Sequence, residues 1–333
     1  MRMDVHTKDH SYPIHLERGI LNRAAGYVTD ANVFLISDDG VPLQWRTILQ
    51  KQFPNAAMHV IPQGEGSKCF EVLQDVLAHM LEEHLSRKDV VIALGGGVVG
   101  DLSGFAASVY MRGIRYVNIP TTMLSMVDSS IGGKTAIDFH GIKNCVGAFW
   151  QPSMVLIDPD VLSTLDDRLL HEGMAEAVKM GMTHDPVLFE RFESDDYMNH
   201  IDEIITRALE VKRGVVERDE RESGERKLLN FGHTYGHAYE SYYELNRYLH
   251  GECVAMGMMT VLKEGQLKDR LTAVLKRLSL PLGCDADKEE ICRLVQSDKK
   301  ADHGTVTMVQ VNELGKGVLE NWDTEMIRKG IGL

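Results

Sequence analysis

The chain has 333 residues, which is long enough for two domains that each bury a core of their own. Hydrophobic residues make up 44% and charged residues 26%, the balance of a soluble globular protein. Lys and Arg total 36 against 49 Asp and Glu, so the formal net charge of −13 argues against non-specific binding to nucleic acid or to an anionic membrane. An anionic small molecule can still be held by a few local cations.

The amino-terminal residues predict no signal peptide, and no stretch approaches the ~20 apolar residues of a membrane span. The five cysteines are odd in number and form no close Cys-x-x-Cys pair. This pattern favours a reducing cytoplasm over a disulfide framework or a thiolate zinc site.

Short apolar runs alternate with amphipathic stretches in the first half of the chain. The sequence predicts a helix over 70–84 and buried strands, in chain order, at 33–37, 57–61, 90–94, 116–119 and 154–157. Alternation of strands and helices is typical of an α/β domain with a parallel sheet.

The strand at 90–94 runs directly into Gly-Gly-Gly-Val-Val-Gly-Asp at 95–101. A strand that ends in glycines and opens a helix lets backbone N–H groups approach a pyrophosphate, and Gly95, Gly97 and Gly100 fit the Gly-x-Gly-x-x-Gly spacing. The competing interpretation is a tight turn with close packing between helix and sheet.

Acidic residues follow two other predicted strands. Asp38 ends the strand at 33–37, and Glu65 lies in the Gly-Glu-Gly-Ser-Lys segment at 64–68. Carboxylates at strand ends can accept hydrogen bonds from ribose hydroxyls, although each could equally cap a turn. Together with the glycine-rich segment they favour one dinucleotide-binding crevice.

A third polar region contains Asp-Ser-Ser-Ile-Gly-Gly-Lys-Thr at 128–135 and Gly-Ile-Lys-Asn at 141–144, with Arg112 upstream. Cations among flexible backbone N–H groups make a site for phosphate or carboxylate, although a solvated loop explains the composition too. The segment lacks the first glycine of a P-loop, because position 128 is Asp, so the sequence does not favour an ATPase.

The second half is mainly helical. Its periodicity predicts helices at 169–182, 198–219, 227–243 and 252–267, and one short strand at 306–311. The predicted boundary lies at 165–167, which gives an α/β domain over 1–166 and a mainly α-helical domain over 167–333.

Histidines in this second domain indicate a metal site. His233 and His237 are four residues apart, so a helix presents both on one face, and His250 follows after a break. Neighbouring glycines at 232, 236 and 251 suggest close approach of backbone or ligand. No carboxylate partner for the imidazoles is apparent nearby in the sequence, and the alternative is a set of ordinary surface or core histidines.

Glu176 is the candidate for the missing carboxylate ligand. It lies three residues before Lys179 on a predicted helix that is otherwise apolar, which suggests a buried, functional pair. The alternative is a surface ion pair. Cys253, beside the His250 motif, is interpreted as a small buried apolar residue.

The assembled motifs resemble the 3-dehydroquinate synthase family of sugar-phosphate cyclases in collinear order over nearly the whole chain. The matching segments are 64–68, 95–101, 120–122, 126–136, 147–152, 174–179, 229–238, 250–255 and 298–300. The resemblance implies a Rossmann-like NAD-binding domain, a helical domain that binds metal and substrate, a catalytic zinc in the cleft between them, and a homodimer.

The same resemblance implies a role for individual residues. The metal ligands would be Glu176, His233 and His250, which suit Zn²⁺ and Co²⁺ equally. The catalytic set would be Asp128, Lys134, Lys179, Lys212, Arg226, Asn230 and His237, and Asn144 would help to bind the substrate phosphate, with Arg112 reaching a neighbouring subunit's site. The NAD contacts would be Asp38, Glu65, Lys68, Gly96, Gly97, Val98, Asp101, Thr121, Thr122, Lys134, Lys143 and Thr164.

The implied activity is a lyase reaction of the shikimate pathway to chorismate and the aromatic amino acids. 3-Deoxy-D-arabino-heptulosonate 7-phosphate would give 3-dehydroquinate and phosphate through transient oxidation by NAD, β-elimination, reduction and intramolecular aldol closure. The alternatives are another sugar-phosphate cyclase, a metal-dependent polyol dehydrogenase, or an NAD-binding regulatory module. Asn230 and His237 are retained in this sequence, which favours the formation of 3-dehydroquinate over that of another cyclic product.

The sequence departs from the family pattern in two places. No cation stands in the segment 304–308, where a basic residue often contributes to the phosphate site, so Lys299 or Lys300 would have to substitute for it. Gly40 stands where an amide side chain is common, which leaves the contacts to adenosine undefined.

Overall fold

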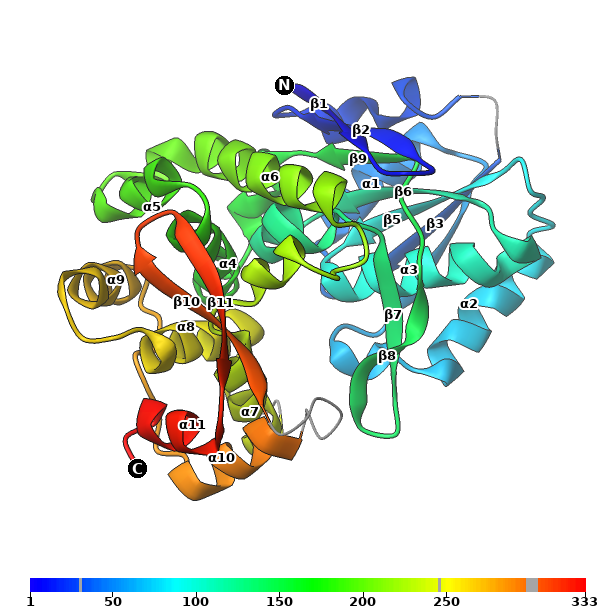
Figure 1. Cartoon of the computed structure of the whole chain (residues 1–333). Coiled ribbons are helices and arrows are strands. Elements are labelled where there is room, and N and C mark those ends of the chain that lie inside the picture. The colour runs from blue at the N-terminus through cyan, green and yellow to red at the C-terminus, as the bar shows by residue number, and fades with distance from the viewer. Residues whose placement is uncertain (30–31, 245–246, 298–304) are drawn as a thin grey trace. The chain divides into compact units, whose positions relative to one another are not determined.

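The computed structural model describes residues 1–29, 32–244, 247–297 and 305–333 (Figure 1). The chain forms two compact units, Met1–Asp166 and Asp167–Leu333. Among the described residues, no helix is long and apolar enough to cross a lipid bilayer.

The first unit is built around a seven-stranded sheet in the order β1-β2-β9-β6-β5-β3-β4. Its strands are β1 (Arg2–His6), β2 (Ser11–Leu16), β3 (Val33–Asp38), β4 (Ala57–Ile61), β5 (Val90–Gly95), β6 (Arg115–Pro120) and β9 (Met154–Ile157). β1 pairs antiparallel with β2, and every other neighbouring pair in this sheet is parallel. The predicted parallel α/β fold is therefore confirmed.

Three α-helices belong to this unit: α1 (Leu43–Gln52), α2 (Phe70–Glu82) and α3 (Gly97–Val109). Apolar side chains of α2 and α3 pack with those of β3 and β5 in one core, which includes Val76, Leu102 and Ala93. The predicted helix at 70–84 is α2, and it ends before His84, whose φ of 54° leaves the helical region.

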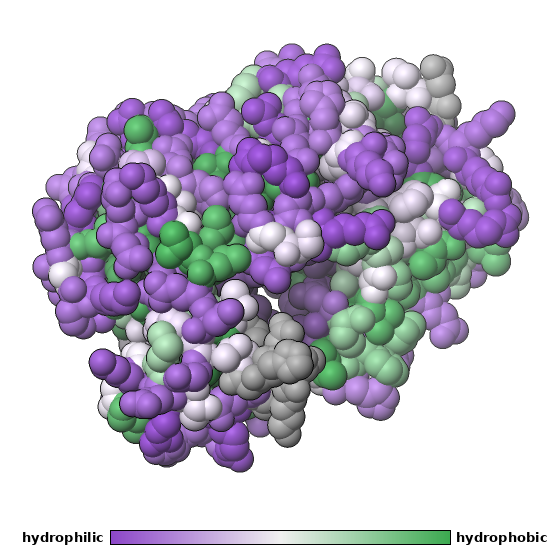
Figure 2. All heavy atoms as spheres, in the orientation of Figure 1, coloured by the Kyte–Doolittle hydropathy of each residue, from purple (hydrophilic) through white to green (hydrophobic). Residues whose placement is uncertain are grey.

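The first unit also contains a hairpin of β7 (Lys134–Phe139) and β8 (Ile142–Phe149). This hairpin includes much of the polar region for which the sequence allowed two interpretations, an anion site or a solvated loop. Its turn is formed by His140 and Gly141, both with positive φ, as in the tight turns that suit twisted hairpins. Phe139, Ile142 and Phe149 are exposed, and Figure 2 shows apolar side chains gathered over this hairpin.

The second unit is mainly helical, as predicted. Its helices are α4 (Asp167–Thr183), α5 (Pro186–Glu193), α6 (Ile201–Arg218), α7 (His233–Tyr242), α8 (His250–Val261), α9 (Gln266–Arg277), α10 (Lys288–Ser297) and α11 (Thr324–Gly330). It also contains an antiparallel hairpin of β10 (Val306–Glu313) and β11 (Lys316–Trp322), of which only the first strand was predicted.

Two helix predictions in this unit were wrong in extent. The segment 227–243 is not one helix, because a 3-10 helix (Glu225–Asn230) ends before Gly232, whose φ of 80° breaks the chain direction ahead of α7. The helix predicted at 252–267 begins two residues earlier and ends at Val261, and the chain then starts α9 at Gln266.

Candidate active site

Helix α4 carries two charged side chains into the interior of the second unit. Glu176 is 1% exposed and Lys179 is 2% exposed, and the Lys179 ammonium contacts Oε2 of Glu176. Taking two charges out of water costs several kcal/mol unless they are paired, so burial here demands the contact. The pair is therefore not the surface ion pair that the sequence left open.

The three predicted metal ligands lie together. His233 Nε2 is 3.6 Å and His250 Nε2 is 3.5 Å from the same oxygen, Oε1 of Glu176. One donor atom from each of the three side chains lies within 4.8 Å of the other two. Oε1 is buried and has no hydrogen-bond partner within the described part of the chain. A divalent cation fits this set, because it would bond the oxygen that is otherwise unsatisfied.

The far nitrogen of each imidazole is held by a hydrogen bond. His250 Nδ1 lies 2.7 Å from Oε1 of Glu240, and His233 Nδ1 lies 3.3 Å from the Phe231 carbonyl oxygen. A carbonyl oxygen only accepts, so Nδ1 of His233 carries the proton and Nε2 presents its lone pair. Metal-ligating histidines typically donate their other ring nitrogen in this way.

Glu240 is the residue that the sequence analysis missed. It is 4% exposed and lies in α7, seven residues after His233 and three after His237. Those spacings place it near the same helix face as the two histidines, which is the signal that could have identified it.

Glycines allow the helices that carry the ligands to approach closely. A Cβ atom at Gly251 would lie 1.9 Å from the carbonyl oxygen of Glu172 in α4, and one at Gly257 would lie 1.9 Å from that of Gly232. Both distances are far inside van der Waals contact. The sequence allowed close approach of either backbone or ligand at these glycines, and at Gly251 the structure shows close approach of backbone.

Electrostatics at the trio favour an ionised carboxylate. Burial alone would raise the pKa of Glu176, but Lys179 and the two imidazoles lower it well below its ordinary value. Burial and the Lys179 ammonium hold the pKa of His233 well below its usual range. Burial also lowers the pKa of His250, yet the carboxylates of Glu176 and Glu240 outweigh it and raise the pKa to about 10. The site therefore favours positive charge, which a metal ion would supply.

His237 does not join the trio with Glu176. Its side chain is exposed, with its ring centroid 5.3 Å from that of His233 and 6.2 Å from that of His250. It forms a separate group with Glu240 and His250, again with donor atoms within 4.8 Å. The predicted i,i+4 pair is thus adjacent, but only its first member faces Glu176.

The remaining predicted substrate residues of this unit are Lys212 in α6 and Arg226 and Asn230 in the 3-10 helix. Both α6 and this 3-10 helix pack against α4 and against each other. Lys212 and Arg226 are buried, and Asn230 Nδ2 donates to Glu222 Oε1 at 2.5 Å. The structure therefore places all three on elements that contact the helix of Glu176.

In the first unit, the predicted NAD residues follow neighbouring strands. The strand order reverses where β3 lies beside β5, and ligands of open α/β sheets bind outside the carboxyl ends at such a point. Asp38 ends β3, and its Oδ1 accepts the backbone N–H of Val41 at 2.9 Å. Gly96 and Gly97 lie at the start of α3, whose first N–H groups point out of the helix.

The glycines of the 95–101 segment have two different uses. A Cβ at Gly95 would lie 2.4 Å from Cγ2 of Val99, and one at Gly100 would lie 2.9 Å from Nδ2 of Asn118. These two glycines serve close packing of α3 on the sheet. A Cβ at Gly97 would meet Ser129 Oγ at 3.2 Å and one at Gly96 would meet Thr122 Cγ2 at 3.1 Å, so Thr122 flanks the helix start.

Lys68 connects residues that were predicted to bind different ligands. It is 4% exposed, its Nζ donates to Asp101 Oδ2 at 2.7 Å, and it also contacts Asn144 Oδ1. Burial raises the pKa of Asp101 to about 6, although Lys68 opposes that rise. Glu65 Oε1 lies 3.8 Å from the same ammonium. Three predicted NAD residues, Glu65, Lys68 and Asp101, therefore form one polar cluster with the predicted phosphate ligand Asn144.

The other predicted residues of the first unit lie on several elements. Thr164 Oγ1 accepts from the indole nitrogen of Trp45 at 2.7 Å, and Arg112 is exposed with a φ of 65°. A Cβ at Gly40 would lie 2.2 Å from Cδ of Gln63, so Gln63 fills the space of the missing amide side chain. The rest, given by position, are Val98 in α3, Thr121 after β6, Asp128 in a short π-helix (Ser125–Ser129), Lys134 in β7 and Lys143 in β8. Lys299, Lys300 and Gly304 lie outside the described residues.

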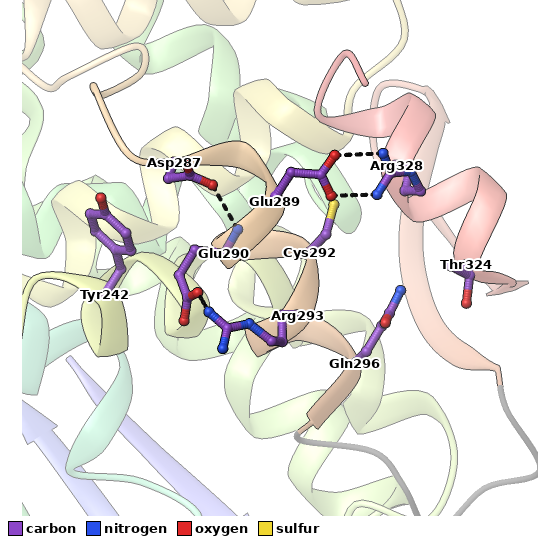
Figure 3. A pocket seen from close by; sticks show the side chains of 9 residues that line it. All are labelled: Tyr242, Asp287, Glu289, Glu290, Cys292, Arg293, Gln296, Thr324 and Arg328. Atoms are coloured by element: carbon purple, nitrogen blue, oxygen red, sulfur yellow. Dashed lines mark hydrogen bonds and ion pairs between the residues drawn. The ribbon is translucent and has the colours of Figure 1, made fainter.

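A cavity of about 680 Å³ lies elsewhere in the second unit, where α10 and α11 meet the end of α7 (Figure 3). Ion pairs between Glu289 and Arg328 and between Glu290 and Arg293 line it, and no predicted site residue does. This cavity is therefore separate from the candidate site.

Comparison with known proteins identifies the family. Models of the N-terminal and C-terminal parts of 3-dehydroquinate synthase match residues 58–172 and 173–301. The chain is 38% identical to the 3-dehydroquinate synthase of Clostridium acetobutylicum, with 97% of each chain covered. It is 40% identical to that of Methylacidiphilum infernorum, over 95% of this chain and 92% of the other.

Solved structures agree with these matches. A 2-epi-5-epi-valiolone synthase from Streptomyces hygroscopicus subsp. jinggangensis with NAD⁺ and Zn²⁺ bound is 27% identical, with a TM-score of 0.87 over 98% of this chain and 97% of the other. A 2-deoxy-scyllo-inosose synthase in complex with carbaglucose-6-phosphate, NAD⁺ and Co²⁺ is 23% identical and shares the fold, with a TM-score of 0.89 over 99% of both chains. The resemblance predicted from the motifs is confirmed: the chain belongs to the 3-dehydroquinate synthase family.

Proposed function

We propose that this enzyme converts 3-deoxy-D-arabino-heptulosonate 7-phosphate to 3-dehydroquinate and phosphate, using NAD and one divalent metal ion. The observation that carries the proposal is the buried Glu176 oxygen that faces the Nε2 atoms of His233 and His250. The full-length similarity to 3-dehydroquinate synthases supports the choice of this reaction.

Glu176, His233 and His250 would hold the metal. When bound, the ion supplies Lewis-acid stabilisation of a substrate alkoxide, and NAD accepts and returns a hydride. Glu240 and the Phe231 carbonyl oxygen fix the two imidazole rings, so Nε2 of each stays directed at the cation. This ligand set suits zinc and cobalt, the two ions named for solved relatives.

Side chains of the second unit would orient the substrate. The guanidinium of Arg226 suits the substrate carboxylate, because its paired N–H groups match two carboxylate oxygens. Lys179, Lys212 and Asn230 would hold hydroxyl and phosphate groups. His237 is exposed and adjacent to two metal ligands, so its imidazole is placed to move a proton near the reacting carbons.

Residues of the first unit would bind NAD and complete the phosphate site. Asp38 would accept hydrogen bonds from a ribose, and the start of α3 at Gly96–Val98 would meet the pyrophosphate. The Lys68–Asp101–Asn144 cluster supports this assignment, since it fixes Asn144 beside the predicted cofactor residues. Asp128 and Lys134 would contact the substrate.

Purified enzyme with metal, NAD⁺ and this substrate is expected to release one phosphate per product without net accumulation of NADH. Chelation should abolish release, and Zn²⁺ or Co²⁺ should restore it. His250→Ala should remove turnover and spare NAD⁺ binding, whereas His84→Ala, at an exposed histidine of the first unit, should leave both turnover and NAD⁺ binding unchanged. Unchanged turnover in His250→Ala would contradict the proposal.

The same assay separates the alternatives. A polyol dehydrogenase would accumulate NADH from a polyol, and the likeness to a glycerol dehydrogenase (TM-score 0.62 at 15% identity) concerns the fold alone. Another cyclase would release phosphate from a different sugar phosphate, so glucose 6-phosphate is the comparison substrate to include. Release from glucose 6-phosphate alone would reassign the reaction within the family.

A homodimer in the cytoplasm completes the proposal. Arg112 supports the first part, because it is exposed and follows two large apolar side chains, Val109 and Met111, that are also exposed. No disulfide joins any of the five cysteines, all of which lie in the described part of the chain, and this supports the second. The molar mass in solution, measured by light scattering for the parent enzyme and Arg112→Ala, tests the dimer, and a monomeric parent enzyme would exclude it.

A further inference from the structure

A second group of metal-ligating side chains lies in the first unit and shares no residue with the site described above. His59 is in β4, and Asp75 and His79 are in α2. His59 Nε2 lies 3.0 Å from Asp75 Oδ2, and His79 Nδ1 lies 3.5 Å from Asp75 Oδ1. One donor atom from each side chain lies within 4.8 Å of the other two.

The backbone fixes this arrangement. Asp75 and His79 are four residues apart on α2, so they lie one above the other on the same face, and His59 reaches them from the edge strand of the sheet. His79 Nδ1 lies 2.9 Å from the carbonyl oxygen of Asp75, which can only accept a hydrogen bond. Nδ1 therefore carries the ring proton while no cation is bound. A cation held by Nδ1, the atom that faces Asp75, would require this proton to move to Nε2.

Ordinary ion pairing is the alternative explanation of the cluster. The two imidazole centroids are only 4.2 Å apart, and two protonated rings at that distance repel. Burial and the charge of His79 lower the pKa of His59, whereas the hydrogen bond to the Asp75 backbone raises the pKa of His79. A neutral His59 ring can donate a lone pair to a metal ion.

We propose that His59, Asp75 and His79 form a second binding site for a divalent transition-metal ion, with zinc as the probe. Two imidazoles and one carboxylate are a ligand set that suits Zn²⁺ and its first-row neighbours, with solvent completing the coordination. The inference stands on these three residues and does not depend on the proposed reaction.

The location gives the site a structural consequence. β4 and α2 are joined by residues 62–69, which include Glu65 and Lys68, so an ion held by both elements ties the two ends of this connection together. Because only the folded arrangement supplies all three ligands, binding raises the stability of this part of the unit. Amide hydrogens of residues 62–69 are expected to exchange more slowly when the ion is bound.

Counting zinc ions tests the proposal. Metal-stripped enzyme is titrated with Zn²⁺ in competition with a chromophoric chelator, in a His233→Ala/His250→Ala background that removes the other site. This background should retain one tight zinc ion per chain, and adding His79→Ala should remove it. Adding His84→Ala instead should not, because His84 lies two residues beyond α2 and outside the cluster.

A second comparison covers the case in which the double variant folds poorly. In otherwise unchanged enzyme, His79→Ala should bind one zinc ion fewer than His84→Ala, and His79 is 44% exposed, so its loss leaves the core intact. Equal zinc content in these two variants overturns the proposal. The proposal is also overturned if the His233→Ala/His250→Ala variant binds zinc only at millimolar concentrations.

Discussion

His250 Nδ1 lies 2.7 Å from Oε1 of Glu240, and this hydrogen bond links the two helices that carry His233 and His250. Glu240 belongs to α7, which begins at His233, whereas His250 begins α8. Helix α7 therefore carries the proposed ligand His233 and orients the imidazole of the proposed ligand His250 in α8. The buried carboxylate also increases the basicity of the imidazole, which strengthens its bond to a cation.

Replacement of Glu240 should weaken metal binding without removing a ligand. Loss of such an outer partner typically costs about 10–100-fold in metal affinity, because the ring loses its fixed orientation and tautomer. Glu240→Ala should therefore show that loss in a competition titration with zinc, and its turnover should recover in excess metal.

Two further variants act as controls for this prediction. Glu240→Gln retains an oxygen that accepts from Nδ1, so its loss of affinity should be smaller than that of Glu240→Ala. Glu244→Gln changes an exposed carboxylate just beyond the same helix and should bind zinc like the parent enzyme. Equal affinity in Glu240→Ala and the parent would show that the hydrogen bond has no influence on the metal.

Gly251→Ala should disrupt the metal site through the backbone. The added Cβ would lie 1.9 Å from the Glu172 carbonyl oxygen, so α8 must move away from α4 and carry His250 away from Glu176. Overpacking of this kind costs about 1–3 kcal/mol, and the variant should unfold at a lower temperature and contain less zinc. Gly283→Ala has no atom within 4 Å of the new Cβ and is the matched control in the same unit. Normal zinc content in Gly251→Ala would contradict the expectation.

Most of the strands that the sequence predicted are nearly completely buried, although β4, which was predicted as well, is mainly half-buried. β3, β5 and β9 are parallel strands buried on both faces, so they appear as continuous apolar runs. β8 and β11 alternate between exposed and half-buried positions, and their mixed composition resembles a loop. Their partners across the hairpins, which no local pattern reveals, are what make them strands.

The candidate site was predictable as a set of residues and less so as a geometry. The motifs identified Glu176, His233 and His250, but the i,i+4 spacing also grouped His237 with them. Gly232, with a φ of 80°, sets where α7 begins and hence which histidine faces Glu176. The position of Gly232 depends in turn on its close packing against α8, which is distant in the sequence. Contacts between distant segments, such as that of Lys68 with Asn144, carry no local signal at all.

Asp219 should control the position of Arg226. Its carboxylate accepts backbone N–H groups from Ser223 at 2.8 Å, Gly224 at 2.7 Å and Arg226 at 3.0 Å. A hydrogen bond to a charged group contributes about 1.5–3 kcal/mol, so Asp219→Ala should release the turn and displace the guanidinium. The expected result is a KM raised about tenfold or more, since about 1.4 kcal/mol corresponds to tenfold in binding. Glu210→Ala, at an exposed position of α6, should leave KM unchanged.

The same carboxylate should make stability depend on pH in the acid range. Partial burial raises the pKa of Asp219, but the N–H groups of the turn outweigh this effect and lower the pKa from 3.8 to about 2. Because the pKa of the folded state lies below that of the unfolded state, the stabilisation is present above 3.8 and is lost as pH falls toward 2.

Asp219→Asn removes this titration and keeps one oxygen acceptor. The midpoint of urea unfolding should therefore differ most between the parent and Asp219→Asn at neutral pH, and the two should converge as the pH falls below about 4. Glu210→Gln, at an exposed carboxylate of α6, is the matched control for the loss of one charge. A difference between the parent and Asp219→Asn that stays constant across this range would mean that the turn does not depend on the charge of Asp219.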